Sequence, residues 1–98
     1  MEIELQYFDG CPSWRILDER LRSVLDAAGR TEAISYVRVE TGEDAERLQF
    51  QGSPTILIDG RDPFDAPGMG FGLTCRLYRT PAGMAGSPTT EQLVAVIV

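Results

Sequence analysis

Apolar and polar residues follow two different periodicities in the first third of the chain. Residues 3–8 alternate apolar with polar almost to their end, which predicts a strand with one face in a core. The strand stops at Asp9-Gly10, a pair typical of turns. Across residues 12–28 the apolar side chains recur every three or four positions, which predicts an amphipathic helix that ends before Gly29. Its apolar stripe comprises Trp14, Leu17, Leu21, Val24, Leu25 and Ala28.

The middle of the chain carries two further strand patterns around a short helix. Residues 33–39 predict a second strand, and residues 55–58 predict a third, buried strand that stops at a turn pair. Thr41 is followed three residues later by Asp44, which resembles a capping box and predicts a short helix after residue 41.

Residues 61–72 follow no period of either kind and are rich in proline and glycine. A loop of this length in a small domain is a lid, a binding loop or ordered surface. Its predicted apolar contacts are Phe64, Met69 and Phe71. Two roles stay open for these side chains, namely holding the loop on its own core or covering a site.

The last third predicts a fourth strand, a turn and a helix. Residues 73–79 alternate and predict the strand, and residues 81–86 predict the turn. The strand face predicted to point inward carries Leu73, Cys75 and Leu77. Ser87-Pro88 has the residue types of an N-cap and a first helical position. The side chains of this helix predicted to face inward are Leu93, Val94, Ile97 and Val98.

The predicted element order is therefore β-α-β-α-β-β-α. A right-handed crossover makes the first two strands parallel, and the third and fourth are expected to pair antiparallel across the loop. The expected architecture is one α/β domain over residues 1–98, with a central four-stranded mixed sheet flanked by three helices.

Composition limits the cellular compartment, the binding partners and the cofactors that the chain is expected to have. The chain has 98 residues, 43% of them hydrophobic, which is enough for a core without disulfides or metal. A net charge of −6 disfavours nucleic acid and anionic membranes as partners. Two cysteines and no histidine predict no metal site, and we expect no cofactor. The acidic start and the lack of a membrane-spanning stretch predict a cytoplasmic protein with reduced thiols.

Cys11 stands where a turn meets a predicted helix. The first amides of a helix have no intrahelical partner and carry partial positive charge, so they favour a thiolate. Pro12 suits the first helical position, which makes Cys11 the expected N-cap. Ser13 is either a hydrogen-bond donor to the sulfur or an ordinary helical residue. Asp9 is either a proton acceptor or donor, or simply a turn former.

Two motifs give the chain a resemblance to the thioredoxin-like superfamily. The first is Cys11-Pro12 at a helix start, and the second is Gly52-Ser53-Pro54-Thr55 just before the third strand. The resemblance implies that Cys11 is the nucleophile and that Pro54 is a cis proline beside it. It also implies that an extended substrate is bound by the backbone of Ser53, in the manner of an added strand.

The chain departs from the family pattern at Trp14, because thioredoxins carry a second cysteine there. The resemblance then implies single-thiol chemistry, in which the Cys11 thiolate attacks a disulfide or soft electrophile and an external thiol releases the product. The expected partner is a protein or low-molecular-weight thiol or disulfide. Trp14 itself is expected to fill the core, with substrate stacking as the alternative. The predicted substrate-binding residues are Pro12, Ser13, Trp14, Ser53 and Pro54.

Cys75 has an open role. Strand geometry places it about five residues, at about 3.3 Å each, from the Cys11 end, which is too far for a disulfide and predicts a small buried residue. The chain is also similar to small thioredoxin-like chains identified as alkylmercury lyases. That resemblance implies soft-metal capture by Cys11 and Cys75 with Asp9 as acid, although no surrounding lyase motif is found. A third hypothesis is a non-catalytic peptide-binding module.

Overall fold

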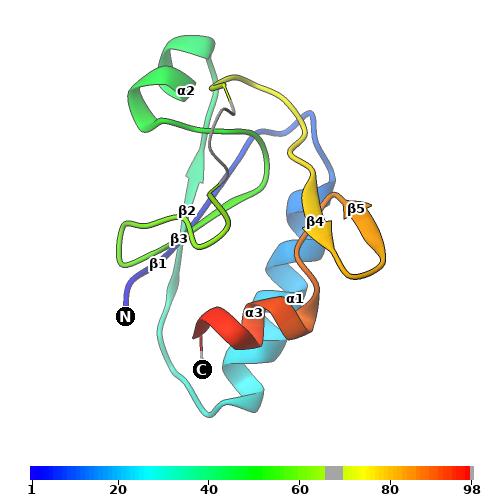
Figure 1. The fold of residues 1–98 in the computed structure, drawn as a ribbon. Coiled ribbons are helices and arrows are strands. Elements are labelled where there is room, and N and C mark those ends of the chain that lie inside the picture. The colour runs from blue at the N-terminus through cyan, green and yellow to red at the C-terminus, as the bar shows by residue number, and fades with distance from the viewer. Residues whose placement is uncertain (66–69, 98) are drawn as a thin grey trace.

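The computed structural model describes residues 1–65 and 70–97. The predicted contacts of Met69 and Val98 lie outside these residues. The described chain forms three helices and two small sheets (Figure 1). The helices are α1 (Ser13–Ala27), α2 (Gly42–Leu48) and α3 (Thr90–Ile97), and the strands are β1 (Ile3–Tyr7), β2 (Ile34–Arg38), β3 (Thr55–Ile58), β4 (Tyr78–Thr80) and β5 (Gly83–Ala85).

The larger sheet has the strand order β2-β1-β3. β1 runs parallel to β2, with Leu5 opposite Tyr36, which confirms the predicted parallel pairing. β1 runs antiparallel to β3, with Leu5 opposite Ile56. The smaller sheet is the hairpin of β4 and β5, in which Arg79 lies opposite Met84.

The predicted central four-stranded sheet is wrong. β4 pairs with β5 instead of β3, and the segment 81–86 that was predicted as a turn contains β5. The reason lies just before β4, where Cys75 forms a parallel bridge with Ser53, two residues before β3 begins. The chain therefore passes this end of β3 in the same direction as β3, so it cannot form the predicted antiparallel pair there. The rest of the small α/β architecture agrees with the prediction.

The main core lies between the larger sheet and the pair α1 and α3, which lie together on one side of the sheet in Figure 1. Its buried members come from both helices and from β1 and β3, namely Ile3, Leu5, Leu17, Leu21, Val24, Leu25, Ile56, Leu93 and Ile97. A second, smaller cluster under α2 consists of Val39, Ala45 and Phe50. The predicted stripe is thus confirmed at Leu17, Leu21, Val24 and Leu25, whereas Trp14 is only partly buried and Ala28 is exposed just beyond the end of α1.

The helix ends follow local signals closely. Gly29 adopts a φ of 68° after α1, the left-handed conformation that was predicted for it. Thr41 accepts a hydrogen bond from the Asp44 amide at 3.0 Å, which confirms the predicted cap of α2. α3 begins later than predicted, because Thr89 rather than Ser87 caps it in a reciprocal pair with Gln92.

The faces of the segment 73–80 are the reverse of the prediction. Leu73 and Leu77 are 38% and 59% exposed, and Cys75 is exposed too. The buried side chains are those of Arg76, Tyr78 and Thr80. This inversion is possible because polar partners elsewhere in the chain bind the two terminal guanidinium nitrogens of Arg76, as described below.

Two further predictions about which side chains contact the core have mixed outcomes. Val94 is 42% exposed and does not face the core as predicted. In the loop after β3, Phe64 packs against the main core, whereas Phe71 is 47% exposed. The described part of this loop is therefore held on the core through Phe64.

Candidate functional site

Cys11 lies at the turn between β1 and α1. Its amide donates to the Phe8 carbonyl at 3.3 Å, which closes the predicted Asp9-Gly10 turn. α1 begins at Ser13 with Pro12 as its N-cap, so Cys11 lies one residue farther from the helix than predicted. Pro12 has no side-chain acceptor, so it forms no capping hydrogen bond with the amides of the first turn of α1. Cys11 is 0% exposed, and its thiol donates to the Ser53 carbonyl at 3.5 Å.

The Ser53–Pro54 bond is cis, as predicted. Ser53 is fully buried, and its hydroxyl accepts a hydrogen bond from the Phe8 amide at 3.3 Å. Its N–H donates to the Thr74 carbonyl at 2.8 Å, and its C=O accepts from the Arg76 amide at 2.9 Å. The backbone groups that the family resemblance assigns to a substrate are thus bonded to the chain's own residues 74–76.

Cys75 sits between those two hydrogen bonds, directly beside Ser53. The neighbouring Cys11 thiol, together with burial, raises the pKa of the Cys75 thiol. The prediction that Cys75 is remote from Cys11 is therefore wrong. The extended strand assumed for that distance does not form, because residues 74–76 are hydrogen-bonded to Ser53 at the cis-proline turn. The prediction that Cys75 is buried is also wrong, since the residue is exposed.

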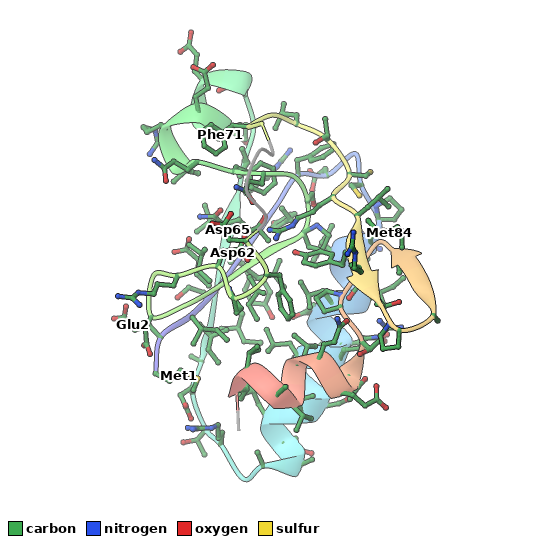
Figure 2. The ribbon with its side chains drawn as sticks, in the orientation of Figure 1. Met1, Glu2, Asp62, Asp65, Phe71 and Met84 are labelled. Atoms are coloured by element: carbon green, nitrogen blue, oxygen red, sulfur yellow. The ribbon has the colours of Figure 1, made fainter. Side chains whose placement is uncertain are left out.

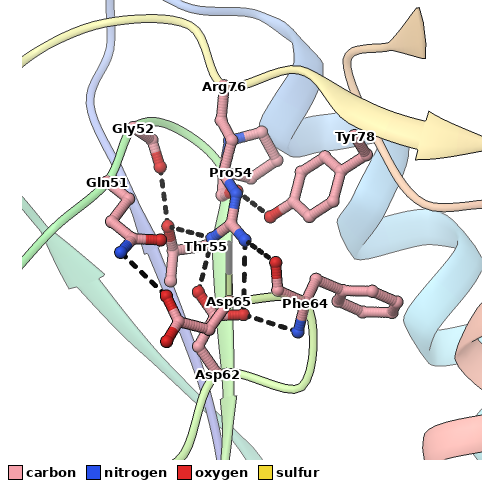
Figure 3. A network of polar contacts seen from close by, with 9 residues as sticks. All are labelled: Gln51, Gly52, Pro54, Thr55, Asp62, Phe64, Asp65, Arg76 and Tyr78. Carbon is pink, nitrogen blue, oxygen red and sulfur yellow. Dashed lines mark hydrogen bonds and ion pairs between the residues drawn. The ribbon is translucent and has the colours of Figure 1, made fainter. Parts of the chain in front are cut away.

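Arg76 anchors this segment through a buried polar network (Figure 3). Its side chain is 1% exposed and forms an ion pair with Asp62 at 2.5 Å. The guanidinium also donates to the Phe64 carbonyl at 2.6 Å and to the Thr55 hydroxyl at 3.3 Å. A buried charge is tolerated only when it is paired and hydrogen-bonded in this way. Arg76 therefore ties residues 74–76 to the loop after β3.

Tyr78 and Gly52 complete the anchoring. The Tyr78 hydroxyl donates to the Pro54 carbonyl, and its ring lies 4.5 Å from the Arg76 guanidinium carbon (Figure 3). Burial raises the pKa of Tyr78, so the phenol stays a donor. Gly52 has a φ of 123°, and a Cβ there would lie 3.0 Å from both the Thr74 carbonyl and the Arg76 Cβ. Glycine thus permits the close approach of the two backbones.

Trp14, Ser13 and Asp9 each contact a partner other than Cys11. Trp14 is partly buried against the core, and its ring stacks on Tyr7 at 4.4 Å. Ser13 lies close to Gly86, where a Cβ would come within 2.5 Å of its hydroxyl. Asp9 is exposed and forms an ion pair with Arg38 at 2.7 Å. The core role expected of Trp14 and the turn role of Asp9 fit these positions.

The sequence reading missed Arg76, Asp62 and Tyr78 as parts of the site. A signal was present, because the alternation in 73–80 has a second face made of Arg76, Tyr78 and Thr80. An arginine on that face, with acidic Asp62 in the preceding loop, is the pattern that indicates a buried ion pair.

The arrangement brings two thiols together, one buried and one exposed. Neighbouring thiols can exchange with disulfides or share a soft metal ion. Within residues 1–65 and 70–97, no three His, Cys, Asp or Glu side chains converge on a metal position.

No helix in the described part of the chain is long and apolar enough to cross a bilayer. Comparisons with family models, curated proteins and solved structures find no match.

Proposed function

We propose that this protein carries out thiol–disulfide exchange with Cys11 and Cys75 acting as a pair. The observation that carries the proposal is the meeting of the two cysteines at Ser53. The Ser53 carbonyl accepts from the Cys11 thiol, and the Ser53 backbone bridges to Cys75. The thioredoxin-like resemblance of Cys11-Pro12 and of the cis Ser53-Pro54 turn supports the same chemistry.

The pair replaces the external thiol of the single-thiol scheme. In that scheme Cys11 alone meets the substrate, but Cys11 has no exposed surface in this structure. With Cys75 beside it, one sulfur can form a mixed disulfide and the other can displace it, which leaves a Cys11–Cys75 disulfide. Both sulfurs must be thiols in the reduced form, which fits the cytoplasmic location we propose.

The experiment compares the wild type with Cys11→Ala and Cys75→Ser. Oxidation of the wild type by a small disulfide should remove both free thiols and about 2 Da of mass, with Cys11 and Cys75 joined in the peptide map. Oxidation of a fluorescent peptide dithiol should fall by on the order of a hundredfold in each variant, because the pair acts as a unit. Circular dichroism of each variant checks that it is folded.

Other outcomes point to the other functions. Turnover that survives in Cys75→Ser and disappears in Cys11→Ala would support the single-thiol scheme with an external resolving thiol. No thiol loss and no turnover in the wild type would favour the non-catalytic binding module.

A second candidate function is binding of a soft metal ion, and the same contact favours it. Two adjacent thiolates suit a soft cation such as Hg(II) or Cu(I). The acid expected for an organomercurial reaction, Asp9, is instead ion-paired with Arg38 at the surface. We therefore restrict this candidate to binding.

Titration with Hg(II) tests it directly. Cys75→Ser should weaken Hg(II) binding as much as Cys11→Ala does, because each variant removes one of two ligands. Equal binding by Cys75→Ser and the wild type would remove this candidate.

A further inference from the structure

We propose that Cys75 is the sulfur that exchanges with substrate, and that the Cys11–Cys75 disulfide oxidises polypeptide dithiols. This inference rests on the proposed function and assigns the two cysteines different roles within it. The assignment reverses the expectation from the family resemblance, in which Cys11 meets the substrate.

Accessibility is the first argument. Cys11 is 0% exposed, whereas Cys75 is exposed. The cover over Cys11 includes residues 74–76, which are joined to Ser53 by two backbone hydrogen bonds. Lifting that cover would also remove the buried Arg76 from Asp62 and the Phe64 carbonyl. Opening of this kind costs several interactions at once, so a substrate meets Cys75 first.

The chemical step follows from this order. A substrate thiolate attacks Cys75 Sγ of the protein disulfide and forms a new S–S bond with it, while the Cys11–Cys75 bond breaks. Its electron pair leaves on Cys11 Sγ, which takes a proton and donates again to the Ser53 carbonyl. The second substrate thiolate then attacks the substrate's own sulfur and releases Cys75, which takes a proton from water. The substrate has lost two electrons, and a small disulfide reoxidises the protein.

The opposite direction is disfavoured by the same contacts. A reduced protein would have to attack a disulfide through the exposed Cys75. Contact with Cys11 raises the pKa of Cys75, so little of it is thiolate near neutral pH. The buried Cys11 cannot replace it without opening the cover. The pair is therefore better placed to accept electrons than to donate them.

The exposed neighbours of Cys75 indicate the substrate class. Leu73 and Leu77 alternate with Cys75 and are exposed with it, and Met84 is 59% exposed on β5 (Figure 2). Met84 lies opposite Arg79, two residues after Leu77, so Leu77 and Met84 share a face of the hairpin. An apolar polypeptide segment would cover this surface, whereas the chain's net charge of −6 disfavours a small anionic thiol such as glutathione.

The experiment maps the first bond formed with substrate. Oxidised wild type is mixed with a peptide that carries one cysteine between leucines, so the reaction stops at the mixed disulfide. Acid quenching, alkylation and peptide mapping then show which cysteine carries the peptide. We expect the peptide on Cys75 in at least about tenfold excess over Cys11. Oxidised protein unfolded in guanidinium, where the peptide thiol should attack both sulfurs of the disulfide alike, is the control for intrinsic reactivity.

A second peptide tests the apolar surface. Replacing its leucines with aspartates should slow adduct formation on the order of fivefold, since both apolar contact and charge then oppose binding. Equal rates for the two peptides would overturn the substrate class.

The outcomes separate this inference from the proposed function. A wild type that forms no Cys11–Cys75 disulfide would remove both. A wild type that forms the disulfide and turns over, but carries the peptide on Cys11, would overturn the role of Cys75 alone.

Discussion

Arg76 shows how one residue decides where a segment lies. Its guanidinium is held by a carboxylate, a carbonyl and a hydroxyl, and it lies over the Tyr78 ring. Because these partners come from the start of β3 and the loop after it, they fix residues 74–76 against the cis-proline turn. The position of Cys75 beside Cys11 is a consequence of this anchoring.

Arg76→Met should therefore destabilise the protein strongly. Methionine is of similar length, but it leaves the Phe64 carbonyl without its donor and the Asp62 carboxylate without its cation, with only the Phe64 amide still bonded to Asp62. Loss of one partner of a buried pair typically costs about 3–5 kcal/mol, which urea unfolding can measure. Arg79→Met is the matched control, because Arg79 is exposed on the same segment and its loss should cost no more than about 0.5 kcal/mol. Equal midpoints for the two variants would contradict the anchoring role.

At the scale of elements, β2 is joined to α1 by a polar contact as well as by the sheet. The Tyr36 hydroxyl donates to the Asp18 carboxylate at 2.5 Å, and Arg22 forms an ion pair with the same carboxylate at 3.1 Å. Asp18 is nearly buried on α1. Burial, the hydrogen bond with Asp18 and the charge of Asp18 raise the pKa of Tyr36 to about 12.

Tyr36→Phe should lower stability by about 1 kcal/mol near neutral pH through loss of this hydrogen bond. The folded state holds the Tyr36 proton more tightly than the unfolded state does. The wild type therefore loses this advantage as pH rises from 10.0 to about 12, and the gap to the variant should close. Urea midpoints across that range measure it. In an Asp18→Asn background the same change should be smaller and less dependent on pH, and an unchanged gap at high pH would refute the contact.

The elements that sequence patterns predicted are those held by local chemistry. The Asp9-Gly10 turn, the Thr41 cap and the left-handed Gly29 each depend on neighbours within a few residues. The face of residues 73–80 does not. Alternation identifies two faces, but which one is buried depends on Asp62 and Phe64 in the loop after β3. The predicted pairing of the third and fourth strands and the predicted separation of Cys11 from Cys75 were wrong because both depend on the same distant contacts.

At the scale of the whole molecule, the two cysteines join parts that are far apart in sequence. Cys11 precedes α1, and Cys75 precedes the β4–β5 hairpin, so a bond between them would close a loop containing α1, β2, α2 and β3. Closing a loop this long would stabilise the fold by about 4 kcal/mol if only the entropy of the unfolded chain mattered. A gain of that size in the folded state would also make the disulfide hard to reduce, because folding and disulfide stability are linked.

An oxidant of dithiols must therefore gain less than this from its own disulfide. The reduced form already has a thiol hydrogen bond from Cys11 to the Ser53 carbonyl, which the disulfide would remove. We expect oxidation to raise the free energy of unfolding by less than about 2 kcal/mol. Urea unfolding of the wild type with and without reductant measures the difference, and Cys75→Ser should show none. A gain of about 4 kcal/mol or more would mark a structural disulfide instead, because a bond held so tightly would not pass its oxidising equivalents to a substrate.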